Sequence, residues 1–234
     1  MQNTDLKNKT FQKVIIAGYR SWAINVFKSL KERFESKQIR LYLAENPHQL
    51  KILRKNHREA LICLVGWSWI VHPIVCEKRY VVCLHPSDLP NYSGGSPIQH
   101  QIIDGIVDTK MTLFKVDSKL DEGDIISKCD LDLRGKLTDI FERMTLASSF
   151  LLEKFINQYP DVELTPQKNE TALHKRRLQP HDSKLEIKFL KNQNQMSVED
   201  LYNFIRCRED PYPNVFIEDE NGKLLFKSVE YIEK

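Results

Sequence analysis

Short apolar runs alternate with amphipathic segments along the first 85 residues. The runs have the length and composition of buried β-strands and lie at residues 13–17, 39–44, 60–66 and 80–85. Residues 21–34 repeat apolar side chains at helical spacing, and Ser21 is placed to cap that helix. Residues 48–57 predict a second, shorter helix. Because strands alternate with helices, the pattern predicts an open, mostly parallel α/β sheet.

The pattern changes after the fourth run. Residues 97–105 can form a helix with Pro97 in its first turn. Residues 110–117 and 124–133 alternate between apolar and polar positions, which predicts two antiparallel strands. A long amphipathic helix is expected over residues 138–159. We therefore predict a Rossmann-like α/β domain over residues 1–170.

The C-terminal part has a different composition. Residues 160–195 are polar and basic, which indicates a linker, and the basic segment 174–177 is expected to be solvated surface. Ser197 begins a helix with a capping-box pattern, and Asn221-Gly222 separates two apolar runs as in a β-hairpin. We assign residues 171–234 to this linker and to a small helix and β-hairpin unit.

Composition narrows the class of protein. The chain has 234 residues, a formal net charge of +3 and 41% hydrophobic residues, which is typical of a globular protein with no need of a nucleic-acid partner. No run approaches the roughly 18 apolar residues of a membrane helix, and the polar N-terminus lacks the core of a signal peptide. Five cysteines without a CxxC pair predict neither a zinc site nor a disulfide framework, so we expect a metal-free protein of the reducing cytoplasm.

Candidate catalytic residues lie in and after the stretch CLHPSDLPNYSGGSPIQHQIIDG, residues 83–105. His85 ends an apolar run, which places it at the carboxyl edge of the sheet, where ligands of open α/β sheets bind. Asp121 follows in the turn KLDEGD. A carboxylate next to one imidazole nitrogen fixes the tautomer and favours proton uptake, as in general base catalysis. Each feature also has a structural interpretation: a packed loop histidine, and a tight turn around Gly123.

Together, "LHPSDLPNYSGGSPIQHQIIDG" and "MTLFKVDSKLDEGDII" resemble the formyltransferase superfamily that uses N10-formyltetrahydrofolate. The resemblance implies that His85 is the general base that deprotonates an attacking amine, with Asp121 orienting it. It implies that Gly94 and Gly95 allow close backbone approach of the substrate. The stretch 176–217 is similar to the branch that formylates nucleotide-linked amino sugars.

Cys83 departs from the pattern of this family, which has asparagine two residues before the histidine. A thiol is a weak hydrogen-bond donor, and losing one donor to the developing oxyanion costs about 3 kcal/mol. Protonated His85 and backbone groups could carry the oxyanion instead, or catalysis could be slow. Cys83 could also be a covalent formyl acceptor, or only a packed cysteine. A binding module that holds folate or nucleotide without turnover is therefore a second hypothesis.

The resemblance also suggests residues for the ligands, although each could equally be structural. Those that would contact the folate co-substrate are Trp67, Ser68, Trp69, Ile70 and Asp117. Those on the side of the acceptor are Ser96 and Gln99, which could hold sugar hydroxyls, and Arg206, a candidate for nucleotide or phosphate contact.

Among the branches of the superfamily, the resemblance favours transfer of a formyl group to a dTDP-linked 4-amino-4,6-dideoxyhexose, a reaction of surface polysaccharide synthesis such as that of the lipopolysaccharide O-antigen. Methionyl-tRNA formyltransferase, which carries a larger C-terminal domain, is the alternative. The amino-sugar branch further implies a homodimer through the C-terminal hairpin, which has too few strands to be stable alone. Neither a nucleic acid nor a membrane is expected as a partner.

Overall fold

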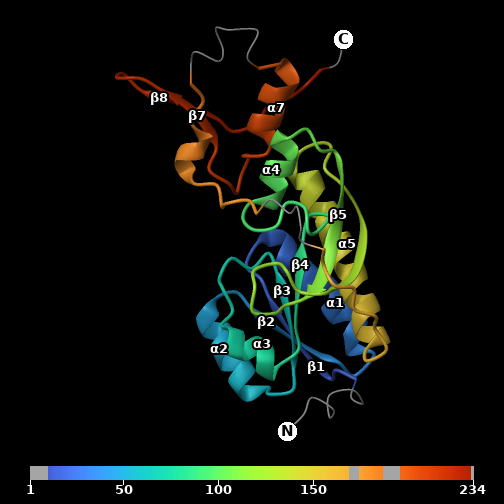
Figure 1. Cartoon of the computed structure of the whole chain (residues 1–234). Helices are drawn as coiled ribbons and strands as arrows, with labels where there is room; N and C mark the ends of the chain where they lie inside the picture. The colour runs from blue at the N-terminus through green and yellow to red at the C-terminus, as the bar shows by residue number, and fades with distance from the viewer. Residues whose placement is uncertain (1–9, 169–173, 187–195, 233–234) are drawn as a thin grey trace.

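The computed structural model describes residues 10–168, 174–186 and 196–232. A six-stranded sheet with the strand order β2-β1-β3-β4-β5-β6 forms its centre (Figure 1). The first four strands in that order are parallel: β2 (Arg40–Ala44), β1 (Lys13–Ala17), β3 (Leu61–Val65) and β4 (Val81–His85). The last two strands are β5 (Asp108–Lys115) and β6 (Ile125–Asp132). β5 pairs antiparallel with β4, and β6 pairs antiparallel with β5. The prediction of a Rossmann-like, mostly parallel α/β sheet is confirmed.

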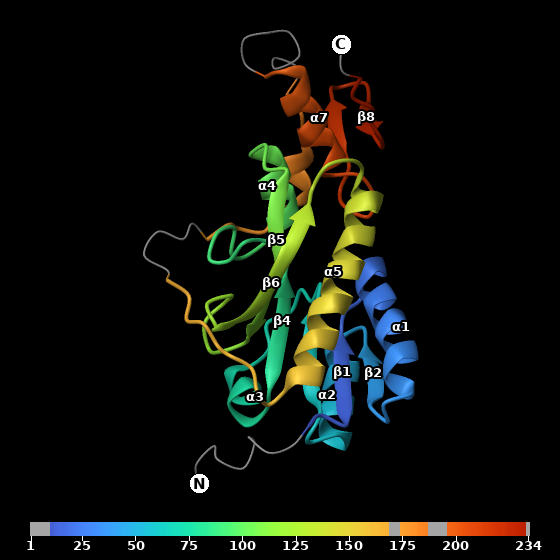
Figure 2. The same ribbon diagram turned by 90° about the vertical axis from the view of Figure 1, so that its right-hand side faces the viewer.

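Helices cover both faces of the sheet. One face packs against α1 (Ser21–Glu35) and α5 (Leu137–Gln158), which lie side by side in Figure 2. The other packs against α2 (Pro47–Asn56) and α3 (Pro73–Lys78). Since β3 lies inside this sandwich, all five of its residues are buried, which explains why its sequence is apolar throughout.

Two local expectations differ from the structure. Helix α1 begins at Ser21, but its N-cap is Arg20, and no side chain caps it. The short helix α3 was not predicted, because six residues after a proline are too few to show a helical repeat. In α3 the imidazole Nδ1 of His72 accepts the Ile74 backbone N–H and caps the first turn.

A small C-terminal unit lies beyond α4 (Pro97–Ile103), at the end of the molecule away from the N-terminus (Figure 1). It contains the 3-10 turn η2 (Pro180–Ser183), α7 (Val198–Arg206) and the hairpin of β7 (Val215–Glu218) and β8 (Lys223–Phe226). The capping box of Ser197 is present, with its Oγ accepting the Asp200 N–H. The division of the chain near residue 170 stays a prediction.

Candidate active site

A cleft of about 440 Å³ opens at the carboxyl edge of the parallel strands. The loops after β1, β3 and β4 line it, together with the turn before β6 and the segment 174–178. All predicted site residues except two line this cleft: Trp67, Ser68, Trp69, Ile70, Cys83, His85, Gly94, Gly95, Ser96, Gln99 and Asp121. The fold therefore gathers side chains from four distant stretches of sequence at the edge where an open α/β sheet binds ligands.

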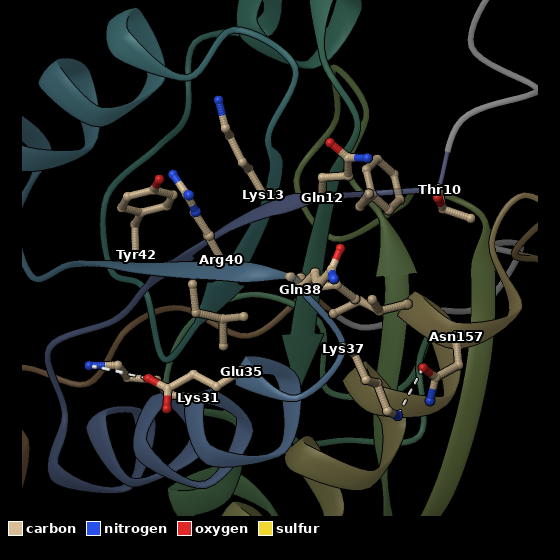
Figure 3. Close-up of a pocket in the computed structure, with 14 residues that line it drawn as sticks. Thr10, Gln12, Lys13, Lys31, Glu35, Lys37, Gln38, Arg40, Tyr42 and Asn157 are labelled. Carbon is tan, nitrogen blue, oxygen red and sulfur yellow. Dashed lines mark hydrogen bonds and ion pairs between the residues drawn. The ribbon is translucent and has the colours of Figure 1, made fainter.

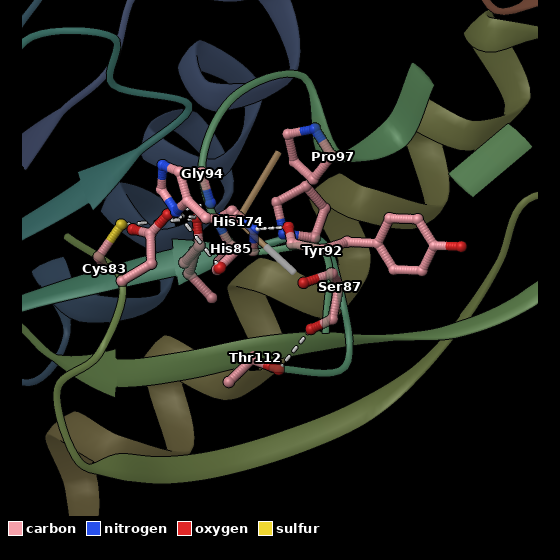
Figure 4. Close-up of polar contacts among 12 residues, drawn as sticks. Cys83, His85, Ser87, Tyr92, Gly94, Pro97, Thr112 and His174 are labelled. Atoms are coloured by element: carbon pink, nitrogen blue, oxygen red, sulfur yellow. Dashed lines mark hydrogen bonds and ion pairs between the residues drawn. The ribbon is translucent and has the colours of Figure 1, made fainter. Parts of the chain in front are cut away.

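His85 and Asp121 form the centre of the cleft. His85 is buried at the end of β4, and its Nδ1 lies 3.6 Å from Asp121 Oδ2. Its Nε2 lies 2.9 Å from the Tyr92 carbonyl oxygen (Figure 4). Because a carbonyl only accepts, Nε2 carries the proton of the neutral imidazole and Nδ1 has the free lone pair. The tautomer is thus set by the backbone at Tyr92, and Asp121 lies beside the nitrogen that gains charge on protonation.

The turn that carries Asp121 is held in an uncommon conformation. Asp121 has φ +56°, in the left-handed region, which costs a non-glycine residue roughly 1–2 kcal/mol. Its Oδ2 accepts the Gly94 N–H at 2.8 Å. The Gln167 side-chain amide donates to the carbonyls of Asp121 and Gly123 at 2.9 and 2.7 Å. A side chain at Gly123 would meet the Lys115 carbonyl, so the turn packs directly on β5. These contacts fix the carboxylate opposite His85.

Gly94 and Gly95 allow close approach of another part of the chain. The Gly95 N–H donates to the Lys175 carbonyl at 2.7 Å, and the Lys175 N–H donates to the Ser93 carbonyl at 2.8 Å. A Cβ on Gly95 would lie 2.5 Å from the Arg177 backbone. The glycines therefore admit the segment 174–178, which we call the strap. Both glycines also line the cleft, and their predicted role in substrate approach stays a prediction.

The strap was missed as a part of the site. Its arginine side chains are exposed, in agreement with the prediction of solvated surface, but residues 174–178 also line the cleft. The Leu178 N–H donates to Ser96 Oγ at 3.1 Å, and His100 Nε2 donates to the Arg176 carbonyl at 2.9 Å. Glycines next to each other in a loop were the available signal, because they mark close backbone contact.

Polar side chains below His85 hold the loop in place. Thr112 Oγ1 donates to the Ser87 carbonyl at 2.6 Å, and Ser87 Oγ donates to the Asn91 carbonyl at 2.7 Å (Figure 4). The buried side-chain amide of Gln101 donates to the Pro86 carbonyl at 2.8 Å. These contacts position the backbone between His85 and Gly94, and no motif in the sequence pointed to them.

Cys83 lies next to this centre as a neutral thiol. Burial, followed by the nearby Asp121 carboxylate, raises its pKa well above the ordinary value of a cysteine. Its Sγ lies 3.7 Å from the Leu84 carbonyl, a weak contact. A thiol that stays protonated is a poor nucleophile, so this environment disfavours the covalent interpretation of Cys83.

An aromatic wall forms one side of the cleft. The rings of Trp67 and Trp69 lie 4.8 Å apart, and Tyr19 packs on Trp69 at 4.9 Å. The Tyr19 hydroxyl and Ser68 Oγ share a hydrogen bond of 2.7 Å. Trp67 Nε1 is buried and finds no hydrogen-bond partner among the described residues. A planar, polar heterocycle such as the pterin of a folate fits this wall, because it offers both a stacking face and an acceptor for the orphaned N–H.

Other residues of the cleft lining are polar or cationic. Gln99 is 4% exposed, and its Nε2 lacks a partner among the described residues. The guanidinium of Arg20 lies 5.0 Å from the ring centres of Tyr19 and of Tyr212, which holds it at the cleft. Gln99 and Arg20 thus give the cleft a donor and a positive charge for an acceptor that carries hydroxyl groups and an anionic group.

Two predicted ligand contacts are not supported. Arg206 is 3% exposed, and its guanidinium donates to the carbonyls of Leu133 and Gly135 at 2.7 and 2.9 Å. It therefore ties α7 to the end of β6 and lies outside the cleft lining. Asp117 is exposed, and its Oδ1 accepts the Lys119 N–H at 2.8 Å, which makes it part of a turn. Neither residue lines the cleft.

A larger hollow of about 980 Å³ lies at the opposite edge of the sheet (Figure 3). Residues near the amino ends of β1 and β2 line it, among them Lys13, Arg40 and Tyr42. Its lining holds Glu35 but no histidine and no partner that would make Glu35 a base, since this carboxylate lies 3.9 Å from Lys31. The smaller cleft is therefore the candidate active site.

Metal chemistry finds no support in the part of the chain that the structure describes. Within residues 10–168, 174–186 and 196–232, no three His, Cys, Asp or Glu side chains form a group that could hold a metal ion. All five cysteines are unpaired. No helix of these residues has the length and apolar character needed to cross a membrane.

The fold and the cleft define an α/β protein with a histidine–carboxylate pair at the carboxyl edge of its sheet. Residues 14–146 match the formyl transferase family, and the chain belongs to that family. This confirms the resemblance seen in the sequence. The chain is 25% identical over 178 residues to methionyl-tRNA formyltransferase of Rickettsia bellii, covering 73% of this chain and 55% of that protein. It spans about half the length of the curated relatives it matches.

Solved structures resemble the whole chain. A methionyl-tRNA formyltransferase from Clostridium thermocellum has 30% identity and a TM-score of 0.83, covering 95% of this chain and 94% of that one. A 4-N formyltransferase from Francisella tularensis has 14% identity and a TM-score of 0.74, covering 96% and 100%. HypX from Aquifex aeolicus, in complex with tetrahydrofolic acid, has 17% identity and a TM-score of 0.74, covering 93% and 37%. The last two show a shared fold.

Proposed function

We propose that this protein transfers a formyl group from N10-formyltetrahydrofolate to the amine of a nucleotide-linked amino sugar. The observation that carries the proposal is the His85–Asp121 pair in a cleft that is also lined by an aromatic wall and by polar and cationic groups. Membership of the formyl transferase family supports the reaction type. Trp67, Ser68, Trp69 and Ile70 would hold the folate, and Ser96, Gln99 and Arg20 would face the acceptor.

When bound, N10-formyltetrahydrofolate supplies the activated formyl carbon. His85 Nδ1 accepts the proton that the attacking amine loses as the new C–N bond forms. Asp121, 3.6 Å away, stabilises the imidazolium, while Nε2–H stays bonded to the Tyr92 carbonyl. His85 then returns the proton to the departing nitrogen as the old C–N bond breaks, so that one residue acts first as base and then as acid.

Cys83 stands where the family has an asparagine, and we propose that it packs without reacting. Protonated His85 and backbone N–H groups would stabilise the charge on the formyl oxygen instead. A Cys83→Ala variant separates the alternatives. Retention of turnover within about threefold supports packing, because a change of roughly 0.5 kcal/mol is too small for the loss of a reacting group. Complete loss of turnover would show that the thiol itself takes part.

The acceptor is best tested by a competition between two classes. We expect a dTDP- or UDP-linked 4-amino-4,6-dideoxyhexose, as used for surface polysaccharides such as the O-antigen, because Arg20 offers positive charge to a diphosphate. The methionyl-tRNA alternative has one specific observation in its favour: a structure of nearly the same extent bears the name methionyl-tRNA formyltransferase. Chain length therefore does not exclude it.

The experiment incubates the chain and N10-formyltetrahydrofolate with a panel of 3- and 4-amino sugar nucleotides and, separately, with methionyl-tRNA. Mass spectrometry detects a gain of one formyl group. Formylation of a sugar nucleotide but not of methionyl-tRNA supports the proposal, and the reverse result refutes the acceptor. If nothing is formylated although folate binds, the protein is a binding module.

We further propose that the protein acts as a homodimer in the cytoplasm. Apolar side chains of the C-terminal unit are exposed, among them Val198, Leu224, Leu225 and Ile232. A two-stranded sheet is marginal alone and gains stability when a second copy covers it. The unpaired cysteines fit a reducing compartment. Sedimentation of a monomer at micromolar concentration would refute the dimer.

A further inference from the structure

Positive charge is concentrated in the first third of the chain. Residues 11–80 contain thirteen lysines and arginines but only five acidic residues, whereas the whole chain has 35 and 32. The remainder is therefore net acidic. Such an asymmetry within one folded body indicates a surface that meets an anion.

The fold gathers part of this charge around a hollow of about 330 Å³ between α2 and α3. Its described lining holds five cationic side chains, no carboxylate and two apolar residues, Ile74 and Val75; the cations are Lys51, Arg54, Lys55, Lys78 and Arg79. Glu77 lies on α3 but is not part of the lining. We call this site the basic hollow.

The charges of the basic hollow are held close together by the backbone. The Arg79 guanidinium donates to the carbonyls of His57, at 3.0 Å, and of Arg54. These bonds fix Arg79 at the end of α2, next to other cations. Burial, followed by repulsion from Arg54 and Arg58, lowers the pKa of Arg79. An anion bound here would relieve that repulsion.

A short stretch of chain joins the lining of the cleft to the lining of the basic hollow. Ile70 lines the cleft and is 89% exposed, and Ile74 lines the basic hollow and is 46% exposed. Ile74 is four positions after Ile70, which limits their Cα distance to about 14 Å. A ligand with an extended tail that leaves the cleft past Ile70 therefore has to span only this short distance to reach the basic hollow.

We infer that the basic hollow binds the γ-linked oligoglutamate tail of the folate co-substrate. The inference rests on the proposed function, since it requires a folate in the cleft. A folate ends in a glutamate, and intracellular folates are extended by further γ-linked glutamates, each of which adds a carboxylate. One such unit is longer than the roughly 3.5 Å of an α-linked residue, so three or four units cover the interval from Ile70 to Ile74. A flexible row of carboxylates matches cations that have no acid among the described lining residues.

The experiment measures binding of 5-formyltetrahydrofolate, a stable analogue, as the monoglutamate and as the pentaglutamate. Isothermal titration at low salt gives both dissociation constants. We expect the pentaglutamate to bind at least about tenfold more tightly, with most of this advantage lost near 0.5 M salt, because exposed charges are screened over a few ångströms there.

The variant Lys51→Glu/Lys55→Glu/Lys78→Glu reverses three exposed charges of the basic hollow. It should lose the pentaglutamate advantage, whereas monoglutamate affinity, which the cleft sets, provides the reference. The control Lys28→Glu/Lys31→Glu/Arg40→Glu reverses three exposed charges on α1 and β2. It should keep the advantage, which separates a local site from a general effect of net charge.

Three outcomes would overturn the inference. Equal affinity of the two forms for the unaltered protein would show that the tail is not bound. Equal loss in the control would show that only net charge matters. If the first variant instead loses binding of unfractionated tRNA and keeps the pentaglutamate advantage, the basic hollow belongs to a nucleic acid. If neither folate binds, the co-substrate assigned in the proposed function is wrong. That result differs from equal binding of the two forms, which refutes only the tail site.

Discussion

The two edges of the central sheet differ in what they can do. The hollow at the amino edge has about twice the volume of the cleft at the carboxyl edge, about 980 against 440 Å³. Yet only the smaller cleft holds a histidine against a carboxylate, with donors left unpaired among the described residues. Among the residues that the structure describes, four non-glycine residues have positive φ, and three of them line or border the smaller cleft: Tyr92, Ser96 and Asp121. The candidate catalytic residues lie at strand ends and in constrained loops, and the volume of a cavity alone does not identify the active site.

The largest expected effect comes from His85. A His85→Asn variant keeps a polar side chain, which is smaller than imidazole and has no basic nitrogen to accept the proton. We expect kcat to fall by about 10²–10⁴-fold, the usual contribution of general acid–base catalysis. Rapid-mixing or endpoint mass spectrometry measures it, and folate affinity is the control that the cleft is intact. Unchanged kcat would show that His85 takes no part in the mechanism. The carboxyl edge would then have no catalytic histidine to distinguish it from the amino edge.

Asp121→Asn should have the next largest effect. The amide cannot balance the imidazolium charge, and we expect kcat to fall by about 10²-fold with KM for folate little changed. Because the carboxylate also accepts the Gly94 N–H, part of any loss could be structural. Asn retains an acceptor oxygen for that bond, and circular dichroism checks the fold. A loss confined to KM would contradict the charge role.

Gly95→Ala tests the strap and should have an intermediate effect. The new Cβ would lie 2.5 Å from the Arg177 backbone, so the strap must move. We expect the free energy of unfolding to fall by about 1–3 kcal/mol, the usual cost of overpacking, and KM for the acceptor to rise. Gly222→Ala, in the C-terminal hairpin, meets nothing within 4 Å and is the matched control. Equal effects of both variants would contradict the role of the strap.

The smallest effect is expected at the amino edge. Arg40 is exposed and lines the larger hollow. Arg40→Ala should leave kcat and both KM values within about twofold, as is usual for surface substitutions. Arg20→Ala, the matched change in the cleft, should raise KM for the acceptor. If Arg40→Ala has the larger effect on turnover, the amino edge takes part in function and the comparison fails.

The sequence allowed prediction of those features of the fold and of the site that depend on local patterns of residues. The four parallel strands could be predicted because burial on both faces leaves apolar runs such as Leu61–Val65. The meeting of His85 with a carboxylate could be predicted because His85 ends a strand and the resemblance supplies Asp121. What could not be predicted depends on distant contacts. Arg206 looks like an exposed helix cation, but carbonyls of Leu133 and Gly135 bury it.

The strap is a second feature that the sequence did not predict, because it also depends on distant contacts. Its polar composition is that of a linker, and its contacts with Ser93 and Gly95 are made by the backbone, which leaves no side-chain signature. The structure places Asp117 outside the cleft lining for a similar reason. Its place beside a conspicuous turn suggested a ligand, whereas its carboxylate accepts the N–H two residues ahead.

The strap has one further consequence. The family match ends at residue 146 and includes His85 and Asp121, but the part of the cleft that packs on the glycine loop is built by residues 174–178. Under the proposed function, part of the acceptor side is thus encoded apart from the proton-transfer pair. Substitutions in the strap could retune which amine is accepted while the bond-making centre stays as it is. An engineer seeking a new acceptor would randomise these five codons first.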